Sequence, residues 1–110
     1  MTLFDSMKKG TVEVVVLSML LESDMYGYQL VQEILKLTNG KYVLKEGALY
    51  PILYKLTEQN FVSTYTTYYG RRPRVYYHLE PAGVEYAKSI YNAYNELTQS
   101  VYAVTANKYN

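Results

Sequence analysis

Apolar residues fall at helical spacing within a nearly uninterrupted hydrophobic run over residues 10–22. The residues that carry this spacing are Val12, Val15, Val16, Met19 and Leu20. The pattern predicts a buried first helix. A strand is the alternative, because the β-branched valines of this run lose side-chain freedom in a helix and favour extended backbone.

A second amphipathic run follows over residues 26–37 and predicts a second helix. Its apolar face consists of Leu30, Ile34 and Leu37. Ser23 and Asp24 precede the run and are typical helix N-caps, because their side-chain oxygens accept hydrogen bonds from free backbone N–H groups. Asn39-Gly40 follows it, and both residue types tolerate the left-handed conformation that ends many helices.

The third predicted helix begins between Glu46 and Ala48 and ends near Asn60. Its buried face repeats at helical spacing and consists of Leu49, Leu53 and Leu56, with Ile52 beside them. Pro51 favours the later start, since proline fits best in the first turn, where its missing N–H has no helical partner. Asn60 is the predicted C-terminal stop, because asparagine also visits the left-handed region.

Two runs rich in valine, threonine and tyrosine, residues 61–68 and 74–79, follow the third helix. This composition is typical of strands, and Gly70 and Pro73 between the runs are typical turn residues. The sequence therefore predicts a β-hairpin with a turn built on these two residues. The turn region carries Arg71, Arg72 and Arg74.

The last apolar pattern, over residues 81–107, repeats every seven residues. It forms two ladders, with Gly83, Ile90, Leu97 and Val104 in one and Ala87, Tyr94 and Val101 in the other. A helix of ~27 residues spans ~40 Å, which is more than the remaining core can cover. The ladders therefore predict a seam against a second chain, and we expect a homodimer.

The composition fits one core and one function. The chain has 110 residues, of which 49% are hydrophobic and 15 are tyrosine. It contains no cysteine, which excludes disulfides, thiolate nucleophiles and cysteine-type zinc sites. No apolar run reaches the ~20 residues of a membrane span, and the N-terminus lacks the layout of a signal peptide. We expect a cytoplasmic protein without a membrane partner.

The net charge is only +1, but the basic side chains are concentrated in the middle of the chain. Residues 41–79 carry six basic side chains against two acidic ones, whereas the rest of the chain carries five against eight. Because local charge governs attraction to phosphates, this distribution favours a nucleic-acid partner.

A compact helix followed by an arginine-tipped hairpin is how a winged helix-turn-helix holds double-stranded DNA. Unburied side chains of the third helix would enter the major groove, while the arginines would contact phosphates or a narrow minor groove. The predicted DNA-binding residues are Tyr26, Lys45, Gly47, Ala48, Tyr50, Pro51, Tyr54, Lys55, Arg71, Arg72 and Arg74. The alternatives are that the helix tyrosines pack against the core and that the arginines lie in a solvated loop.

The sequence gives no support for catalysis. His78 is the only histidine and lies in a predicted strand, where a structural role is the usual one. No carboxylate pair, serine–histidine set, phosphate-binding loop or metal-ligand spacing appears. We therefore expect no enzymatic activity, no metal site and no cofactor.

The chain resembles the PadR family of bacterial winged-helix transcriptional regulators, particularly its short members with a single C-terminal helix. The resemblance covers nearly the whole chain and is carried by Tyr26-Gly27-Tyr28, by residues 46–53, by Gly70-Arg71-Arg72-Pro73-Arg74 with Tyr76-Tyr77 and Leu79, and by Gly83. Three positions depart from the family pattern. This chain has Ala48 where a hydroxyl residue is common, Glu80 where a threonine cap is common, and Asn60 where glycine is common.

The resemblance implies a homodimer that binds a two-fold DNA operator, usually to repress transcription. It also implies that the last helix forms the dimer interface with help from the N-terminal helix. The expected interface residues are Leu3, Phe4, Ala87, Ile90, Tyr94, Leu97, Val101 and Val104. Family members often respond to an aromatic or drug-like compound, which implies a small aromatic effector here, with Tyr91 and Tyr94 as candidate stacking residues.

The sequence thus predicts a mainly α fold with a small β-hairpin (α+β), a winged helix-turn-helix with a long C-terminal dimerisation helix. Residues 1–79 are assigned to DNA binding and residues 80–110 to dimerisation, within one compact unit. The predicted function is that of a DNA-binding transcriptional repressor. Two alternatives stay open, a winged-helix adaptor that binds another protein and a small-molecule binding protein without specific DNA binding. The three arginines together favour the regulator over the adaptor.

Overall fold

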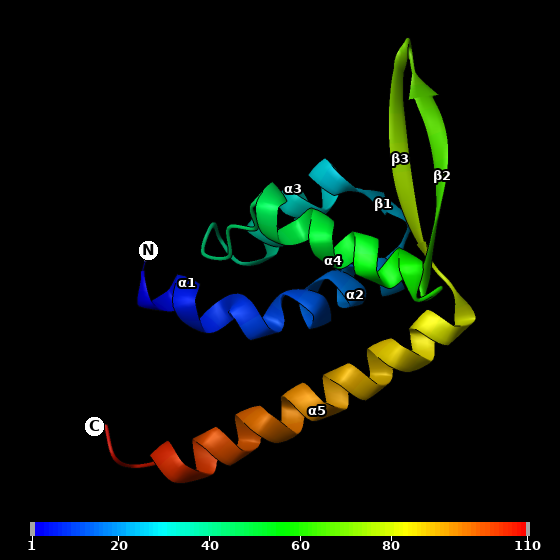
Figure 1. Cartoon of the computed structure of the whole chain (residues 1–110). Coiled ribbons are helices and arrows are strands. Elements are labelled where there is room, and N and C mark those ends of the chain that lie inside the picture. Colours follow the sequence, from blue (N-terminus) through cyan, green and yellow to red (C-terminus); the bar gives the residue numbers. More distant parts are fainter. Residues whose placement is uncertain (1, 110) are drawn as a thin grey trace.

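A computed structural model describes residues 2–109. Residue 1 of the expected DNA-binding segment and residue 110 of the expected dimerisation segment lie outside the described part. It has a helical body, a hairpin that projects from the body and a long C-terminal helix (Figure 1). The elements in chain order are α1 (Leu3–Lys8), the 3₁₀ turn η1 (Lys9–Thr11), α2 (Val12–Glu22), β1 (Met25–Tyr26), α3 (Gly27–Leu37), α4 (Glu46–Glu58), β2 (Val62–Tyr69), β3 (Arg72–Leu79) and α5 (Pro81–Thr105). This confirms the predicted mainly helical winged helix-turn-helix fold with a long last helix.

The first apolar run forms the helix α2 and not a strand. Its buried residues are Val12, Val14, Val16, Leu17, Met19 and Leu20. The helix begins at Val12 and not at Gly10, because η1 interrupts the backbone there. The apolar patterns did not predict α1, although the family resemblance implied an N-terminal helix. It begins with a capping box in which the Asp5 N–H donates to Thr2 Oγ1 at 3.0 Å and the Thr2 N–H donates to Asp5 Oδ2 at 3.3 Å.

The start of α3 differs from the prediction. Ser23 and Asp24 do not cap it: its N-cap is Tyr26, which makes no side-chain cap bond. The reason is that Met25 and Tyr26 are extended and pair with β3 as the short strand β1, a strand that the sequence analysis did not predict. The end of α3 is as predicted, since Asn39 and Gly40 both have positive φ angles.

Helix α4 buries the predicted face of Leu49, Leu53 and Leu56. It begins at Glu46, the earlier of the two predicted starts, so Pro51 lies inside the helix and not in its first turn. The predicted stop is confirmed, because Asn60 has φ of 62° and the following Phe61 N–H donates to the Leu56 carbonyl at 3.0 Å.

The sheet has the order β1-β3-β2, with both pairs antiparallel. The hairpin turn is tighter than predicted: it consists of Gly70, with φ of 64°, and Arg71, and it connects the pair Tyr69↔Arg72. Pro73 lies within β3 and not in the turn. Its missing N–H breaks no ladder bond, since Tyr68↔Pro73 follows the turn-closing pair, where the backbone N–H points away from the partner strand.

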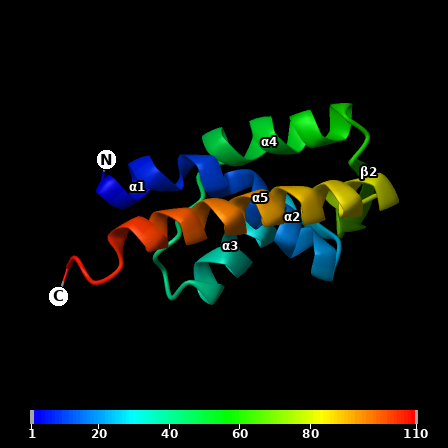
Figure 2. The ribbon, with the colours of Figure 1, turned by 90° about the horizontal axis from the view of Figure 1, so that it is seen from below.

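Only the first part of α5 packs against the body. Gly83 and Ala87 are its buried residues, whereas Leu97, Val101 and Val104 are exposed. Seen from below in Figure 2, α5 runs along α2 with α3 on one side and α4 on the other. Its C-terminal half continues away from the core, which gives the molecule an elongated outline of 56 × 29 × 21 Å. No helix within residues 2–109 has the length and hydrophobicity needed to cross a membrane.

Candidate nucleic-acid interface

Helix α4 presents the face opposite its buried leucines to solvent. Because Leu49, Leu53 and Leu56 point inward with Ile52 packed beside them, most of the other positions of the helix face outward. All the predicted contact residues on and just before this helix are exposed, namely Lys45, Gly47, Ala48, Tyr50, Pro51, Tyr54 and Lys55. Tyr54 is the more exposed of the two tyrosines, with 68% of its surface exposed against 43% for Tyr50. An exposed helix face of this kind is what a major groove can accept.

Tyr50 has a packing role in addition to its exposed edge. Its hydroxyl lies directly over Gly27 at the start of α3, where the Cβ of any larger residue would overlap it. The side chain therefore joins α4 to α3, which explains the glycine in the sequence Tyr26-Gly27-Tyr28. The sequence left open that the helix tyrosines are packing residues, and for Tyr50 this holds for the hydroxyl end of its ring.

The three arginines lie at the far end of the hairpin, and strand alternation puts two of them on one face. Arg71 is in the turn, while Arg72 and Arg74 share a face of β3. That face also carries the rings of Tyr26, Tyr65, Tyr69 and Tyr76. We use the name wing face for the following residues: Arg71, Arg72, Arg74, Tyr26, Tyr65, Tyr69 and Tyr76.

Arg74 is held between two aromatic rings on the wing face. Its guanidinium carbon lies 4.6 Å from the centroid of the Tyr26 ring and 4.7 Å from that of Tyr69. Tyr76 supports the first of these rings, with a centroid distance of 5.4 Å and an edge-on geometry. Tyr26 thus positions an arginine, a role that the sequence analysis did not assign to it.

Asp24 anchors the base of the wing face. Its carboxylate accepts a hydrogen bond from the Tyr65 hydroxyl at 2.7 Å and lies 2.8 Å from Nδ1 of His78. These bonds lower the pKa of Asp24, with the His78 bond the larger cause, and the same bond raises the pKa of His78. Sequence reasoning missed this cluster, because Asp24 lies more than 40 residues from each of its two partners along the chain.

Replacing Asp24 by asparagine should return the pKa of His78 towards its ordinary value of 6.5. Because folding raises the pKa of His78, its stabilising contribution is present below the unfolded pKa and is lost as pH rises through the folded pKa. Folding lowers the pKa of Asp24, so its contribution to the free energy of unfolding is present above its ordinary pKa of 3.8. That contribution is lost as pH falls through the lowered pKa of the folded state.

The measurement is an NMR titration of His78, the only histidine of the chain. A matched control is Glu80→Gln, since Glu80 lies at 4.0 Å from the other ring nitrogen and should change the pKa of His78 less. A His78 titration that is the same in wild type and Asp24→Asn would contradict the assignment.

The predicted interface residues divide into two groups. Ala87 is buried and Ile90 packs partly against the core of the same chain. The remaining residues are exposed to different degrees: Leu3, Phe4, Tyr94, Leu97, Val101 and Val104. No group of three or more histidine or carboxylate side chains in residues 2–109 is arranged to hold a metal ion.

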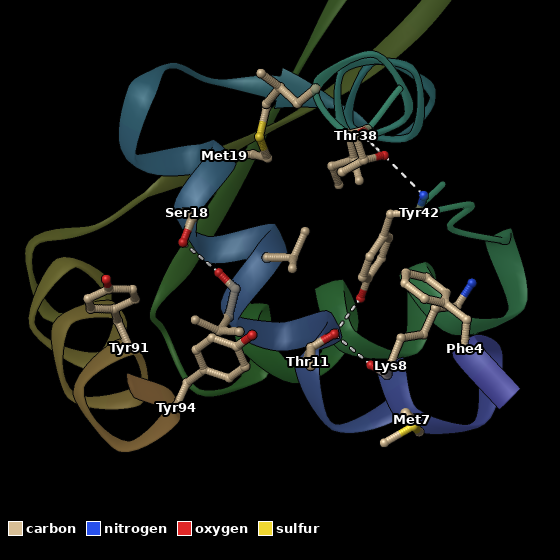
Figure 3. A pocket seen from close by; sticks show the side chains of 14 residues that line it. Phe4, Met7, Lys8, Thr11, Ser18, Met19, Thr38, Tyr42, Tyr91 and Tyr94 are labelled. Atoms are coloured by element: carbon tan, nitrogen blue, oxygen red, sulfur yellow. Dashed lines mark hydrogen bonds between the residues drawn. The ribbon is translucent and has the colours of Figure 1, made fainter. Parts of the chain in front are cut away.

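An apolar cavity of ≈ 510 Å³ lies between α1, α2, the end of α3 and α5. Figure 3 shows Tyr91 and Tyr94 of α5 on one side and Phe4, Lys8 and Tyr42 on the other. The Tyr42 hydroxyl lies 2.8 Å from Thr11 Oγ1 at the cavity edge. The two predicted stacking tyrosines are thus brought to one cavity, whose lining is mostly hydrophobic with a few hydroxyl groups.

Comparison with known proteins identifies the family. Residues 16–89 match the sequence model of the transcriptional regulator PadR-like family, which is more than half of the chain. The transcriptional regulator YqjI of Escherichia coli is 37% identical over 54 residues, which cover 49% of this chain and 26% of that protein. The matched segment, about half of this chain, therefore corresponds to about a quarter of that relative.

Solved structures agree along most of the chain. A transcriptional regulator from Clostridium thermocellum is 30% identical, with a TM-score of 0.82 over 93% of this chain and 99% of that one. A PadR family transcriptional regulator from Eggerthella lenta is 25% identical, with a TM-score of 0.78 over 94% and 88% of the two chains. These matches confirm the resemblance and the expected absence of an enzymatic function. The chain belongs to the PadR-like family of transcriptional regulators.

Proposed function

We propose that this PadR-like regulator is a repressor that binds a two-fold operator as a homodimer. The observation that carries the proposal is the joint presentation of an exposed α4 face and an arginine-bearing wing. Figure 1 shows that the hairpin projects from the body close to the end of α4, so one duplex can contact both. Repression follows where the bound protein covers promoter DNA. Such a regulator acts where the DNA is, which in a bacterium is the cytoplasm.

The two surfaces would have different tasks. The exposed α4 side chains, with Tyr54 at their centre, would face base edges in the major groove. Gly47 and Ala48, in the first turn of α4, would let backbone N–H groups approach a phosphate. Arg71, Arg72 and the stacked Arg74 would neutralise phosphates that flank a narrow minor groove.

The exposed half of α5 supports the homodimer. Tyr94, Leu97, Val101 and Val104 follow one another at alternating three- and four-residue spacing, which places them on one helix face. Of these side chains, Leu97, Val101 and Val104 have little of their own chain to pack against. A second copy would cover this apolar face, with Leu3 and Phe4 of α1 extending the contact. A two-fold dimer places two wings on one duplex, which matches a two-fold operator.

The cavity beside Tyr91 and Tyr94 is the proposed site of a small aromatic effector. Its volume of ≈ 510 Å³ is in the range of small-molecule pockets. The tyrosine rings offer stacking surfaces, and the hydroxyl groups of Thr11 and Tyr42 offer hydrogen bonds at one end. The site therefore suits a planar apolar compound with one polar group.

Changing Arg72 and Arg74 together to alanine tests DNA binding by the wing. Each phosphate contact contributes about 0.9 to the slope of log affinity against log salt. If both arginines reach phosphates, the slope falls by about 1.8, and low-salt affinity falls at least about tenfold on every duplex. Fluorescence anisotropy across a salt series measures both quantities.

The double change Lys36→Ala and Lys88→Ala is the control, because it removes the same charge from exposed positions away from the wing. It should leave the slope nearly unchanged. If the wing variant also keeps the wild-type slope, the wing does not touch phosphates. The protein-adaptor alternative would then gain support.

A further inference from the structure

Three helices meet at the carboxylate of Glu13. Its Oε1 accepts a hydrogen bond from the Tyr86 hydroxyl of α5 at 2.5 Å, and its Oε2 accepts one from Nζ of Lys55 in α4 at 3.3 Å. The Glu13 side chain is only 14% exposed, whereas that of Lys55 is 49% exposed. One carboxylate of α2 therefore holds the lysine of the DNA-facing helix and the tyrosine of the C-terminal helix.

Tyr86 is fixed firmly in this arrangement. Its ring stacks on Phe61 with a centroid distance of 4.4 Å and an interplanar angle of 7°. The bond to Glu13 raises the pKa of Tyr86 to about 12, so the hydroxyl remains a donor throughout the physiological range. The position of α5 thus determines whether Glu13 receives this second hydrogen bond.

We propose that Glu13 is an internal competitor for Lys55, and that Tyr86 sets the strength of this competition. While Glu13 pairs with Lys55, it neutralises part of the ammonium charge and competes with a DNA phosphate for it. The Tyr86 bond occupies one carboxylate oxygen and draws charge from it, which weakens the hold on Lys55. Movement of α5 away from α2 would release the carboxylate to Lys55 and lower DNA affinity. This inference rests on the proposed DNA-binding function and adds its regulation.

The apolar cavity lies next to this junction. It is lined by Val14 and Val15, which follow Glu13 in α2, and by Tyr91 and Tyr94, which lie one to two turns beyond Tyr86 in α5 (Figure 3). An occupant that wedges these two helices apart would therefore act on the Glu13–Tyr86 bond. The same displacement would change the availability of Lys55, which links the cavity to α4 through named contacts.

The first test measures binding to a fluorescent mixed-sequence duplex at low salt, which needs no knowledge of the operator. Glu13→Gln should tighten binding about two- to fivefold, the range expected for a half-exposed ion pair. In a Lys55→Met background, the same change should have little effect, because no lysine remains to be released. Glu22→Gln, at the other end of α2, controls for the loss of one negative charge and should change binding little.

The second test uses Tyr86→Phe, which keeps the ring on Phe61 and removes the hydroxyl. It should weaken binding about two- to fivefold, and the combination with Glu13→Gln should bind as Glu13→Gln alone does. Thermal melts of each variant show that the fold is kept.

The outcomes separate the two proposals. If the wild-type protein does not bind the duplex, the proposed function fails. If it binds but Glu13→Gln has equal effects with and without Lys55, only long-range charge is involved and the inference is wrong. Tighter binding by Tyr86→Phe, or an equal effect of this change in the Glu13→Gln background, would also overturn it.

Discussion

Replacing Gly83 by alanine should destabilise the fold by about 3 kcal/mol. A Cβ atom at this position would overlap the backbone carbonyl oxygen of Phe61 and lie 2.7 Å from Cδ1 of Leu79. The carbonyl cannot move aside cheaply, because it accepts a hydrogen bond from the Glu80 N–H at 2.9 Å. The start of α5 would have to leave the body, and with it the Tyr86 and Ala87 contacts.

Chemical denaturation followed by circular dichroism measures this effect. Gly10→Ala is the matched control, since a Cβ there meets nothing within 4 Å and should leave the free energy of unfolding nearly unchanged. A Gly83→Ala protein as stable as the wild type would mean that α5 can dock differently from the arrangement described above. The sequence pattern had placed Gly83 in the seam against a second chain, whereas the structure places it against its own chain.

Leu97→Glu should convert the protein to monomers and lower its affinity for a two-fold operator on the order of 100-fold. Leu97 is 62% exposed in the single chain, at the centre of the apolar face that we assign to the dimer. Burying an unpaired carboxylate in such a face is strongly unfavourable, so association is lost before folding is. A monomer then holds DNA with one α4 and one wing instead of two.

Sedimentation velocity gives the oligomeric state, and fluorescence anisotropy with operator DNA gives the affinity. Gln99→Glu adds the same charge two residues away on the opposite helix face and should remain dimeric. If Leu97→Glu sediments as a dimer, the assigned interface is wrong. A monomer that retains wild-type affinity would instead contradict the two-fold mode of binding.

The fold was predictable where a local apolar pattern determines the structure. The leucines of α4 repeat at helical spacing, and Asn39, Gly40 and Asn60 end their helices as residues of their types commonly do. The strand β1 was not predictable, because it is two residues long and exists only by pairing with Tyr76 and Tyr77 some fifty residues later. Single-sequence patterns do not carry such distant pairings.

The same distinction applies to the candidate site. The sequence placed Arg72 in the turn and began the second strand at Arg74, whereas β3 begins at Arg72, so the shared face of Arg72 and Arg74 follows only from the observed strand bounds. The sequence did not indicate that Lys55 is paired, because its partner Glu13 lies 42 residues earlier in a different helix. Asp24 looked like a cap because cap residues act locally, yet its partners are on the distant hairpin.

The stacked position of Arg74 has a consequence for how the wing distinguishes duplexes. A free arginine side chain loses about 2 kcal/mol of rotamer entropy when it is ordered. Here much of that loss has occurred on folding, because two rings already confine the guanidinium. A rigid cation binds well only where the spacing of the phosphates suits it, whereas a flexible one adapts to many spacings. The wing would therefore respond to the width of a groove, and so to sequence, without contacting a base.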